Sequence, residues 1–214
     1  MVVAIDGPSG VGKSTVARAV ADALGAVYLD TGAYYRMATF VALRAGVTPD
    51  DASGIVRALA GTEVDFVDGH LLLDGTDASQ DLRSPEVTAA VSEVSAHAPV
   101  RASLVKMQRS WVAKQGGEAV VEGRDIGTVV FPAAPVKVFL TADPETRARR
   151  RSADDEAAGN SVAALLDQMA RRDAADSARA TSPLRPAHDA ITIDTGRLSV
   201  AEVVARVLDL VGRV

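Results

Sequence analysis

The feature that most constrains this chain is the octapeptide Gly-Pro-Ser-Gly-Val-Gly-Lys-Ser at residues 7–14, which matches the pattern G-x-x-x-x-G-K-[ST]. A short apolar, β-branched run at residues 2–5 precedes it and predicts a buried strand. Residues 16–24 follow with helical periodicity and end at Gly25. We therefore expect a strand, a glycine-rich loop and a helix in direct succession.

This order of elements suits the binding of nucleotide phosphates. Glycines let backbone N–H groups point into the loop, and the helix N-terminus adds a partial positive charge. Lys13 is expected to reach the β- and γ-phosphates, and the Ser14 hydroxyl is expected to bind Mg²⁺. We call residues 7–14 the phosphate loop. A glycine-rich turn that matches the pattern by accident is the alternative, and the flanking strand and helix argue against it.

Composition narrows the class of protein. The chain has 214 residues, enough for one sizeable core or one core with inserted lobes, and 48% of them are hydrophobic. No apolar run approaches the roughly 20 residues that cross a bilayer, and the N-terminus carries no secretory signal pattern. The absence of cysteine excludes disulfides and thiolate metal sites. We expect a cytoplasmic enzyme without a membrane partner.

Charge argues against nucleic acid as a partner, because the formal net charge is −5. Only four of the 23 basic residues are lysines, and arginine is the better bidentate partner for phosphate. A high genomic G+C content would enrich arginine too, so the positions of the arginines matter more than their number.

The remaining pattern predicts an α/β fold, with further strands at residues 27–30, 119–122, 136–140 and 190–193, separated by helices. Such alternation gives a parallel five-stranded sheet with helices on both faces, as in P-loop NTPases. A hairpin signal with Asp68-Gly69 at its turn is unusual in such a chain and predicts an inserted lobe. We expect one unit, with a core at 1–30, 100–146 and 162–214, an insert at about 31–99 and a short lid at about 147–161.

Arginines stand where predicted strands end and helices begin. Ligands of parallel sheets bind at the carboxyl ends of the strands, where the phosphate loop and residues 30–36 and 122–125 should meet. A phosphate acceptor is already anionic and needs cations rather than a catalytic base. This pattern therefore favours a nucleotide-like acceptor over an alcohol such as shikimate; the arginines concerned are Arg36, Arg101, Arg124, Arg147, Arg150, Arg151, Arg172 and Arg179.

Two of these groups follow helical spacing. Arg147, Arg150 and Arg151 share one face beside a small, polar segment at 152–160, which predicts a lid whose arginines close on the transferring phosphoryl group. A solvated basic face is the alternative. Arg172, Asp176 and Arg179 also share a face, and spacing alone does not separate a substrate contact from an exposed salt-bridge ladder.

The chain resembles the bacterial-type cytidylate kinases, nucleoside monophosphate kinases of the P-loop class, over nearly its whole length. The resemblance rests on residues 5–14, on Leu-Asp-Thr-Gly-Ala-Tyr-Tyr-Arg at 29–36, on Glu-Gly-Arg-Asp-Ile-Gly-Thr-Val-Val-Phe-Pro at 122–132, and on Arg171-Arg172-Asp173 with Arg179 and Pro183-Leu184. The block at 122–132 is the most specific. Glu122 stands where this family often has aspartate.

The resemblance implies ATP-dependent phosphorylation of CMP and dCMP by direct in-line transfer, with Mg²⁺ as cofactor. It implies that the ATP phosphates bind to Gly7, Pro8, Ser9, Gly10, Val11, Gly12, Lys13, Ser14 and Thr15. It places Arg36 and Arg124 on the acceptor phosphate, Arg179 between the nucleotides, and Arg172 and Asp176 on the sugar. Ser92, Arg101 and Asp125 would read the cytosine, with Thr31 and Tyr35 lining that pocket. Catalysis would use Lys13, Arg124 and Arg179 with the lid arginines.

Cytosine carries an exocyclic amine where uracil carries an acceptor. Asp125 and Ser92 can accept from that amine, and Arg101 can donate to the ring acceptors. Because UMP would leave these groups unpaired, we expect CMP and dCMP to be strongly preferred.

Two alternatives stay open. One is a kinase for another small acceptor, such as UMP or shikimate, which would not need Arg101 and Asp125 together. The other is a P-loop nucleotide-binding switch, for which the chain lacks an N-K-x-D guanine-reading sequence. The three histidines do not stand at ligand spacing, so no metal site is expected from them. No long apolar surface stripe is present, and we expect a monomer.

Overall fold

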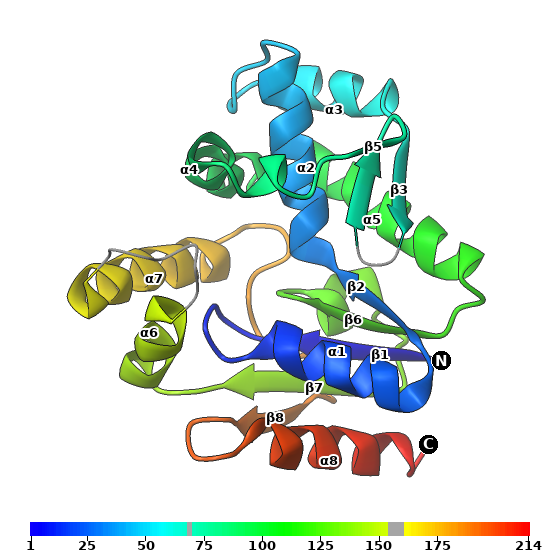
Figure 1. The fold of residues 1–214 in the computed structure, drawn as a ribbon, viewed down its shortest axis with the longest axis vertical. Helices are drawn as coiled ribbons and strands as arrows, with labels where there is room; N and C mark the ends of the chain where they lie inside the picture. Colours follow the sequence, from blue (N-terminus) through cyan, green and yellow to red (C-terminus); the bar gives the residue numbers. More distant parts are fainter. Residues whose placement is uncertain (68–69, 154–160) are drawn as a thin grey trace. The chain divides into compact units, whose positions relative to one another are not determined.

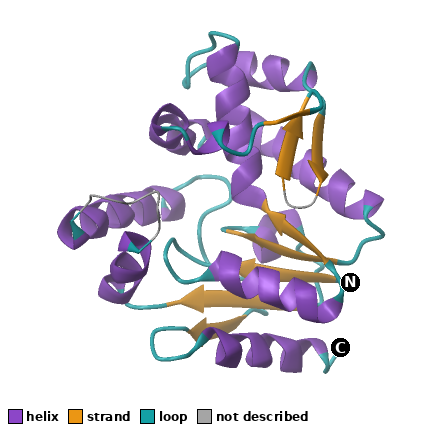
Figure 2. Ribbon diagram, in the orientation of Figure 1, coloured by secondary structure: helices purple, strands orange, loops and turns teal. Residues whose placement is uncertain are grey.

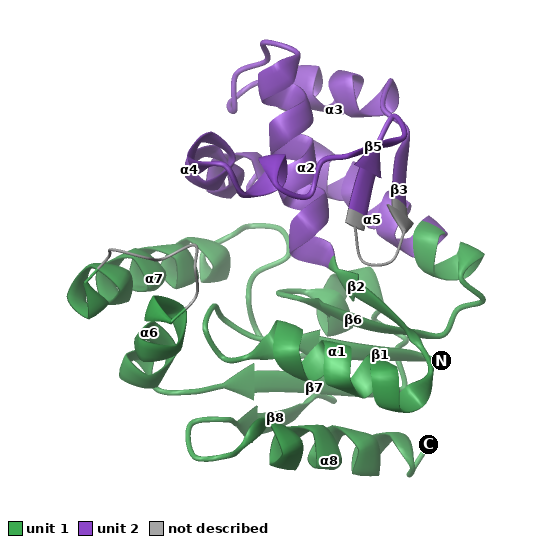
Figure 3. Ribbon diagram, in the orientation of Figure 1, with its two compact units in different colours: residues 1–30, 111–214 green, residues 31–110 purple. Residues whose placement is uncertain are grey.

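A computed structural model describes residues 1–67, 70–153 and 161–214. The chain forms two compact units, which Figure 3 shows in different colours: Met1–Asp30 with Trp111–Val214, and Thr31–Ser110. The expected insert begins at the same residue as the second unit. Its other expected boundary, residue 99, lies before the end of that unit at Ser110. The described part of the expected lid, residues 147–153 and 161, belongs to the first unit.

The first unit contains a five-stranded sheet in the order β2-β6-β1-β7-β8 (Figures 1 and 2). All four neighbouring pairs are parallel, and β1 is central because it pairs with both β6 and β7. The strands are β1 (Val2–Asp6), β2 (Val27–Asp30), β6 (Ala119–Gly123), β7 (Val136–Thr141) and β8 (Ile191–Asp194). The predicted fold class is confirmed, and every predicted strand of this sheet is present within a residue or two.

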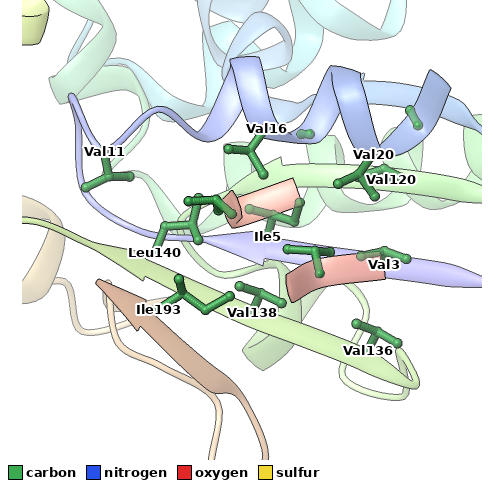
Figure 4. Close-up of a cluster of buried hydrophobic side chains, with 14 of the residues drawn as sticks. Val3, Ile5, Val11, Val16, Val20, Val120, Val136, Val138, Leu140 and Ile193 are labelled. Carbon is green, nitrogen blue, oxygen red and sulfur yellow. The ribbon is translucent and has the colours of Figure 1, made fainter. Parts of the chain in front are cut away.

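Two helices pack on one face of this sheet, α1 (Lys13–Leu24) and α8 (Val200–Val211). Val16 and Val20 of α1 lie over the sheet in Figure 4, and the core also includes Val203 and Val207 of α8. A capping box is present at the start of α8, with Ser199 and Glu202 as its partners. Two further helices, α6 (Pro144–Ser152) and α7 (Val162–Ser177), pack against each other, and Asp143 and Ser161 cap them as the sequence predicts.

Successive side chains of β1 point to opposite faces of the sheet, which separates its hydrophobic contacts from its polar ones. Val3 and Ile5 belong to the core with α1 and α8. Asp6 has the opposite parity, and its carboxylate accepts hydrogen bonds from the backbone N–H groups of Ile126 and Gly127, both at 2.8 Å. These residues open a single π-helical turn, η2 (Ile126–Val130), a type of turn that is frequent at functional sites. The strand that leads into the phosphate loop is thereby tied to the segment after β6.

The second unit is helical with a small antiparallel sheet. Its helices are α2 (Thr31–Arg44), α3 (Ala52–Ala60), η1 (Asp81–Arg83), α4 (Pro85–Val94) and α5 (Ala98–Lys114), of which α5 belongs to this unit through Ser110. Its sheet contains β3 (Val64–Val67), β4 (His70–Leu73) and β5 (Thr76–Asp77) in that order. The predicted hairpin is confirmed in its strands, whereas its Asp-Gly turn at 68–69 lies outside the described residues.

The described helices also bear on membrane insertion. None of them combines the length and the apolar character that spanning a bilayer demands.

The Asp6 contact predicts a pH dependence of stability. Burial raises the pKa of Asp6 to about 6, although the N–H groups of Gly127 and Ile126 oppose this shift. The native protein therefore binds a proton near pH 6, whereas the unfolded chain binds it only near pH 4. As the pH falls from 8 to 5, the free energy of unfolding of the wild type should rise relative to Asp6→Asn by roughly 1.4 kcal/mol, because pH 5 lies about one unit below the native pKa. Urea unfolding of both proteins across this range tests it, and parallel curves would contradict it.

Candidate active site

The phosphate loop lies between β1 and α1, and two of its glycines are required by close packing. A Cβ atom at Gly7 would lie 2.3 Å from the carbonyl oxygen of Leu140 in β7. At Gly10, where φ is +77°, a Cβ would lie 2.7 Å from the carbonyl oxygen of Arg147. Any larger residue at either position would have to displace backbone atoms.

Most carbonyl oxygens between Gly7 and Gly12 accept a hydrogen bond. Within the described residues, five donors reach them: Arg124 Nη1 to Gly7 (3.0 Å), Lys13 Nζ to Pro8 (2.7 Å), Arg147 Nη1 to Ser9 (3.1 Å), Thr195 Oγ1 to Val11 (3.1 Å) and Val16 N to Gly12 (3.0 Å). In a trans peptide the C=O and the following N–H point in opposite directions. Donors that hold the carbonyl oxygens from outside therefore leave the loop's N–H groups pointing the other way.

Lys13 is the first residue of α1 and is buried, with 8% of its surface exposed. Burial, together with the positive charge of Arg124, lowers the pKa of Lys13 to about 7, while Glu122 opposes this effect. The ammonium group is thus held where its charge is costly, and an anion bound beside it would be strongly stabilising. This is the electrostatic setting that a phosphate site requires.

Two arginines beside the loop, Arg124 and Arg179, are linked through the carboxylate of Asp176. Arg124 follows β6, and besides its bond to Gly7 its Nε donates to the Asp176 carboxylate of α7 at 3.1 Å. The other oxygen of Asp176 accepts from Arg179. Asp176 is only 3% exposed. Arg172 lies close enough to lower the pKa of Lys13. The spacing on α7 left open whether Asp176 belongs to an exposed salt-bridge ladder. Because its carboxylate is buried, it does not.

Glu122, the penultimate residue of β6, is a site residue for which no role was expected from the sequence. It is 3% exposed, and its carboxylate accepts hydrogen bonds from the hydroxyl groups of Tyr28 and Ser14. Burial and the nearby Asp30 raise the pKa of Glu122, whereas Lys13 lowers it. Burial and Glu122 also raise the pKa of Tyr28, whose ring lies under the Arg18 guanidinium at 4.5 Å. An acidic residue directly after the buried run 119–121 is the signal that could have identified Glu122.

These residues fit a magnesium ion that arrives with a nucleotide. Mg²⁺ prefers oxygen ligands and usually takes one or two from the protein, with phosphates and water completing the octahedron. The Ser14 hydroxyl and the Glu122 carboxylate supply such oxygens, and they are hydrogen-bonded to each other. No group of three or more histidine, cysteine, aspartate or glutamate side chains in the described part of the chain could hold a metal by itself.

The arginines of α6 are not equivalent. Arg147 is buried, and its Nη1 donates to the Ser9 carbonyl oxygen and to Asp173 Oδ2 of α7, at 3.1 and 2.5 Å. Arg150 donates to the hydroxyl and the carbonyl oxygen of Thr195, at 2.9 and 2.7 Å. Arg151 is half-buried. The predicted common face thus places Arg147 against the phosphate loop and α7, and Arg150 against Thr195. Most of the adjoining polar segment, residues 154–160, lies outside the described residues.

The second unit holds the other predicted acceptor residues. Arg101 of α5 is buried; its Nη1 donates to the Ser95 carbonyl oxygen at 3.2 Å, and its guanidinium lies 5.0 Å from the centre of the Tyr35 ring. Arg36 of α2 donates to the Leu82 carbonyl oxygen and to the Thr88 hydroxyl, both at 3.3 Å. Thr31 is buried and Ser92 is exposed. Asp125, in the first unit beside Arg124, is buried.

Thr195 is a second residue that contacts the site although no role was expected for it from the sequence. It follows β8 and is 2% exposed, and its hydroxyl contacts Arg150, Val11 and Thr141. It joins α6 to the phosphate loop across a long stretch of sequence. No local pattern marks it.

Comparison with solved structures supports the fold. A shikimate kinase from Acinetobacter baumannii, in complex with shikimate, superimposes with a TM-score of 0.51 at 15% identity, covering 99% of this chain and 93% of that one. At this identity the likeness concerns the fold alone.

Comparison of sequences is far more specific. The family model for cytidylate kinase matches residues 3–213. A cytidylate kinase from Mycobacterium leprae is 52% identical over 99% of this chain and 95% of its own length. One from Mycobacterium avium is 51% identical, with the same coverage. These matches favour neither a shikimate-type kinase nor a nucleotide-binding switch. The resemblance to cytidylate kinases extends over nearly the whole chain. The chain belongs to the cytidylate kinase family.

Proposed function

We propose that this protein transfers the γ-phosphoryl group of ATP to CMP and dCMP, giving ADP with CDP or dCDP. The observation that carries this proposal is the arrangement of Lys13, Arg124 and Asp176 with Arg179 around the phosphate loop. Family membership supports the choice of CMP as acceptor. The reaction needs positioning and charge neutralisation more than covalent help, and these cations supply both.

In the proposed reaction, an oxygen of the acceptor phosphate attacks the γ-phosphorus, and the bond from that phosphorus to the oxygen that bridges it to the β-phosphate breaks. Arg124 and Arg179 lie on either side of the Asp176 carboxylate before substrate binds. The acceptor phosphate replaces this carboxylate as their partner, so the repulsion between two polyanions is offset by groups already in place. Arg172 and Asp176 are assigned to the sugar.

On the donor side, the loop N–H groups and Lys13 hold the β- and γ-phosphates. The chemistry that Mg²⁺ supplies when bound is neutralisation of charge on these phosphate oxygens. Ser14 and Glu122 are the residues that hold it, and Tyr28 keeps the Glu122 carboxylate in place. Arg150 and Arg151 remain the candidates of α6 for contact with the transferring group.

In the second unit, Arg36 is assigned to the acceptor phosphate. Ser92 and Arg101 are assigned to the cytosine together with Asp125 of the first unit, and Thr31 and Tyr35 to its surroundings. Arg101 is already oriented by its contacts with Ser95 and Tyr35, which lowers the entropy lost on binding. A cytoplasmic location and a monomeric state stay predictions.

Removal of Arg124 tests the acceptor-phosphate assignment. Arg124→Met should lower kcat by about 10²- to 10³-fold, because one preorganised donor to the reacting phosphates is lost. Arg171→Met on α7 is a matched control, since Arg171 is exposed and pairs only with Asp167 among the contacts described. A coupled assay of ADP release measures both. Comparable activity of the two variants would overturn the assignment.

A panel of acceptors tests base recognition. With ATP as donor, CMP and dCMP should exceed UMP by at least about a hundredfold in kcat/KM, because UMP leaves buried polar groups unpaired. Arg101→Met should reduce this ratio, whereas Lys106→Met, an exposed change on the same helix, should not. Equal use of UMP and CMP would refute the base-reading set. ATP hydrolysis that ignores every monophosphate would instead favour the switch.

A further inference from the structure

The phosphate loop is held from outside at two adjacent residues by the α6–α7 pair. Arg147 of α6 donates from one nitrogen, Nη1, both to the Ser9 carbonyl oxygen (3.1 Å) and to Asp173 Oδ2 of α7 (2.5 Å). The Arg147 side chain is 10% exposed and that of Asp173 is 18% exposed. The ion pair is thus largely shielded from water, and both partners belong to the first unit.

Packing at the next residue is a second, independent observation. A Cβ at Gly10 would lie 2.7 Å from the Arg147 carbonyl oxygen and 2.9 Å from the Met169 Cε of α7. The loop backbone therefore lies directly against both helices, and it cannot move toward them. Arg147 adds a hydrogen bond to this steric stop.

The hydrogen bond has a directional consequence. The Ser9–Gly10 peptide is trans, because the structure describes no cis peptide bond. In a planar trans peptide, an arginine that fixes the Ser9 C=O on the α6 side points the Gly10 N–H to the opposite side. In a loop of this kind, such N–H groups are the ones from which phosphate oxygens accept.

We propose that Arg147 and Asp173 are a positioning pair, which orients the Ser9–Gly10 peptide for the phosphates of ATP. This rests on the proposed function, in that the loop is taken as the ATP site. Asp173 neutralises the buried guanidinium and holds Arg147 on Ser9. Arg147 then acts through the loop backbone, in contrast to the lid contact with the transferring phosphoryl group that helical spacing predicted for it.

The experiment compares Asp173→Asn, Arg147→Met, their double variant and Arg147→Lys with the wild type. Asp167→Asn is the matched control, because Asp167 lies on the same helix in an exposed pair with Arg171. The first readout is calorimetric affinity for a non-hydrolysable ATP analogue without CMP. The second is the KM for ATP and for CMP, measured separately. Circular dichroism checks that each variant folds.

We expect Asp173→Asn and Arg147→Met each to weaken analogue binding about tenfold and to raise the KM for ATP, with the KM for CMP within about twofold of wild type. The double variant should be no weaker than Arg147→Met, since the two residues act as one unit. Arg147→Lys should retain most of the affinity, because one nitrogen makes both bonds. Asp167→Asn should match wild type.

The inference is wrong if Asp173→Asn binds the analogue like wild type while Arg147→Met slows turnover, since Arg147 would then contact the phosphoryl group directly. Equal effects of Asp167→Asn and Asp173→Asn would also overturn it. If Asp173→Asn does not fold, equal loss of affinity in Arg147→Lys and Arg147→Met contradicts the proposal. A wild type that binds ATP but ignores CMP would refute the proposed function and leave this test of the loop in place.

Discussion

The site depends on one constraint of the peptide group: a loop that offers its N–H groups to an anion must place its carbonyl oxygens elsewhere, and those oxygens need donors. In this chain, three of the five donors come from residues far away in the sequence. Arg124 comes from the end of β6, Arg147 from α6 and Thr195 from the segment after β8, while Lys13 and Val16 are local. The loop's conformation is therefore a property of the whole first unit, because few of these bonds would persist in an isolated strand–loop–helix fragment.

Two of these donors, Lys13 and Arg124, also carry positive charge that the proposed chemistry uses. Burying cations beside one another is unfavourable, and the lowered pKa of Lys13 records that cost. Carboxylates offset it at fixed places: Asp176 between Arg124 and Arg179, Asp173 at Arg147, and Glu122 near Lys13. Each of these cations is thus partly neutralised and already placed. In the proposed reaction a phosphate replaces a carboxylate as the partner of these cations and does not have to assemble the site, which limits the reorganisation on binding.

Much of this fold could be predicted from local sequence signals. The parallel sheet follows from the five apolar runs, and the helix starts follow from Ser84, Asp143, Ser161 and the Ser199–Glu202 capping box. What periodicity could not supply is the environment of a helical face. Arg147 and Arg150 do share one, but spacing does not tell whether that face meets water or the phosphate loop. The meeting of Tyr28 with Glu122 depends on the register of β2 with β6, and the position of Thr195 depends on the order of the strands. The first is set by a pairing across 92 residues, from Val27 to Ala119, and the second by the pairing of β8 with β7 across 53 residues, from Val138 to Ile191.

The position of β1 at the centre of its sheet has a consequence for biosynthesis. Its two neighbours are β6 and β7, which end at Gly123 and Thr141, whereas the second unit is one uninterrupted stretch of chain, Thr31–Ser110. On the ribosome, β1 emerges before both of its partners and has neither to pair with until more than a hundred further residues have been translated. The second unit can collapse during that interval, because all of its sequence is available earlier. Vectorial synthesis therefore leaves the apolar β1 without its partner strands while the second unit is completed.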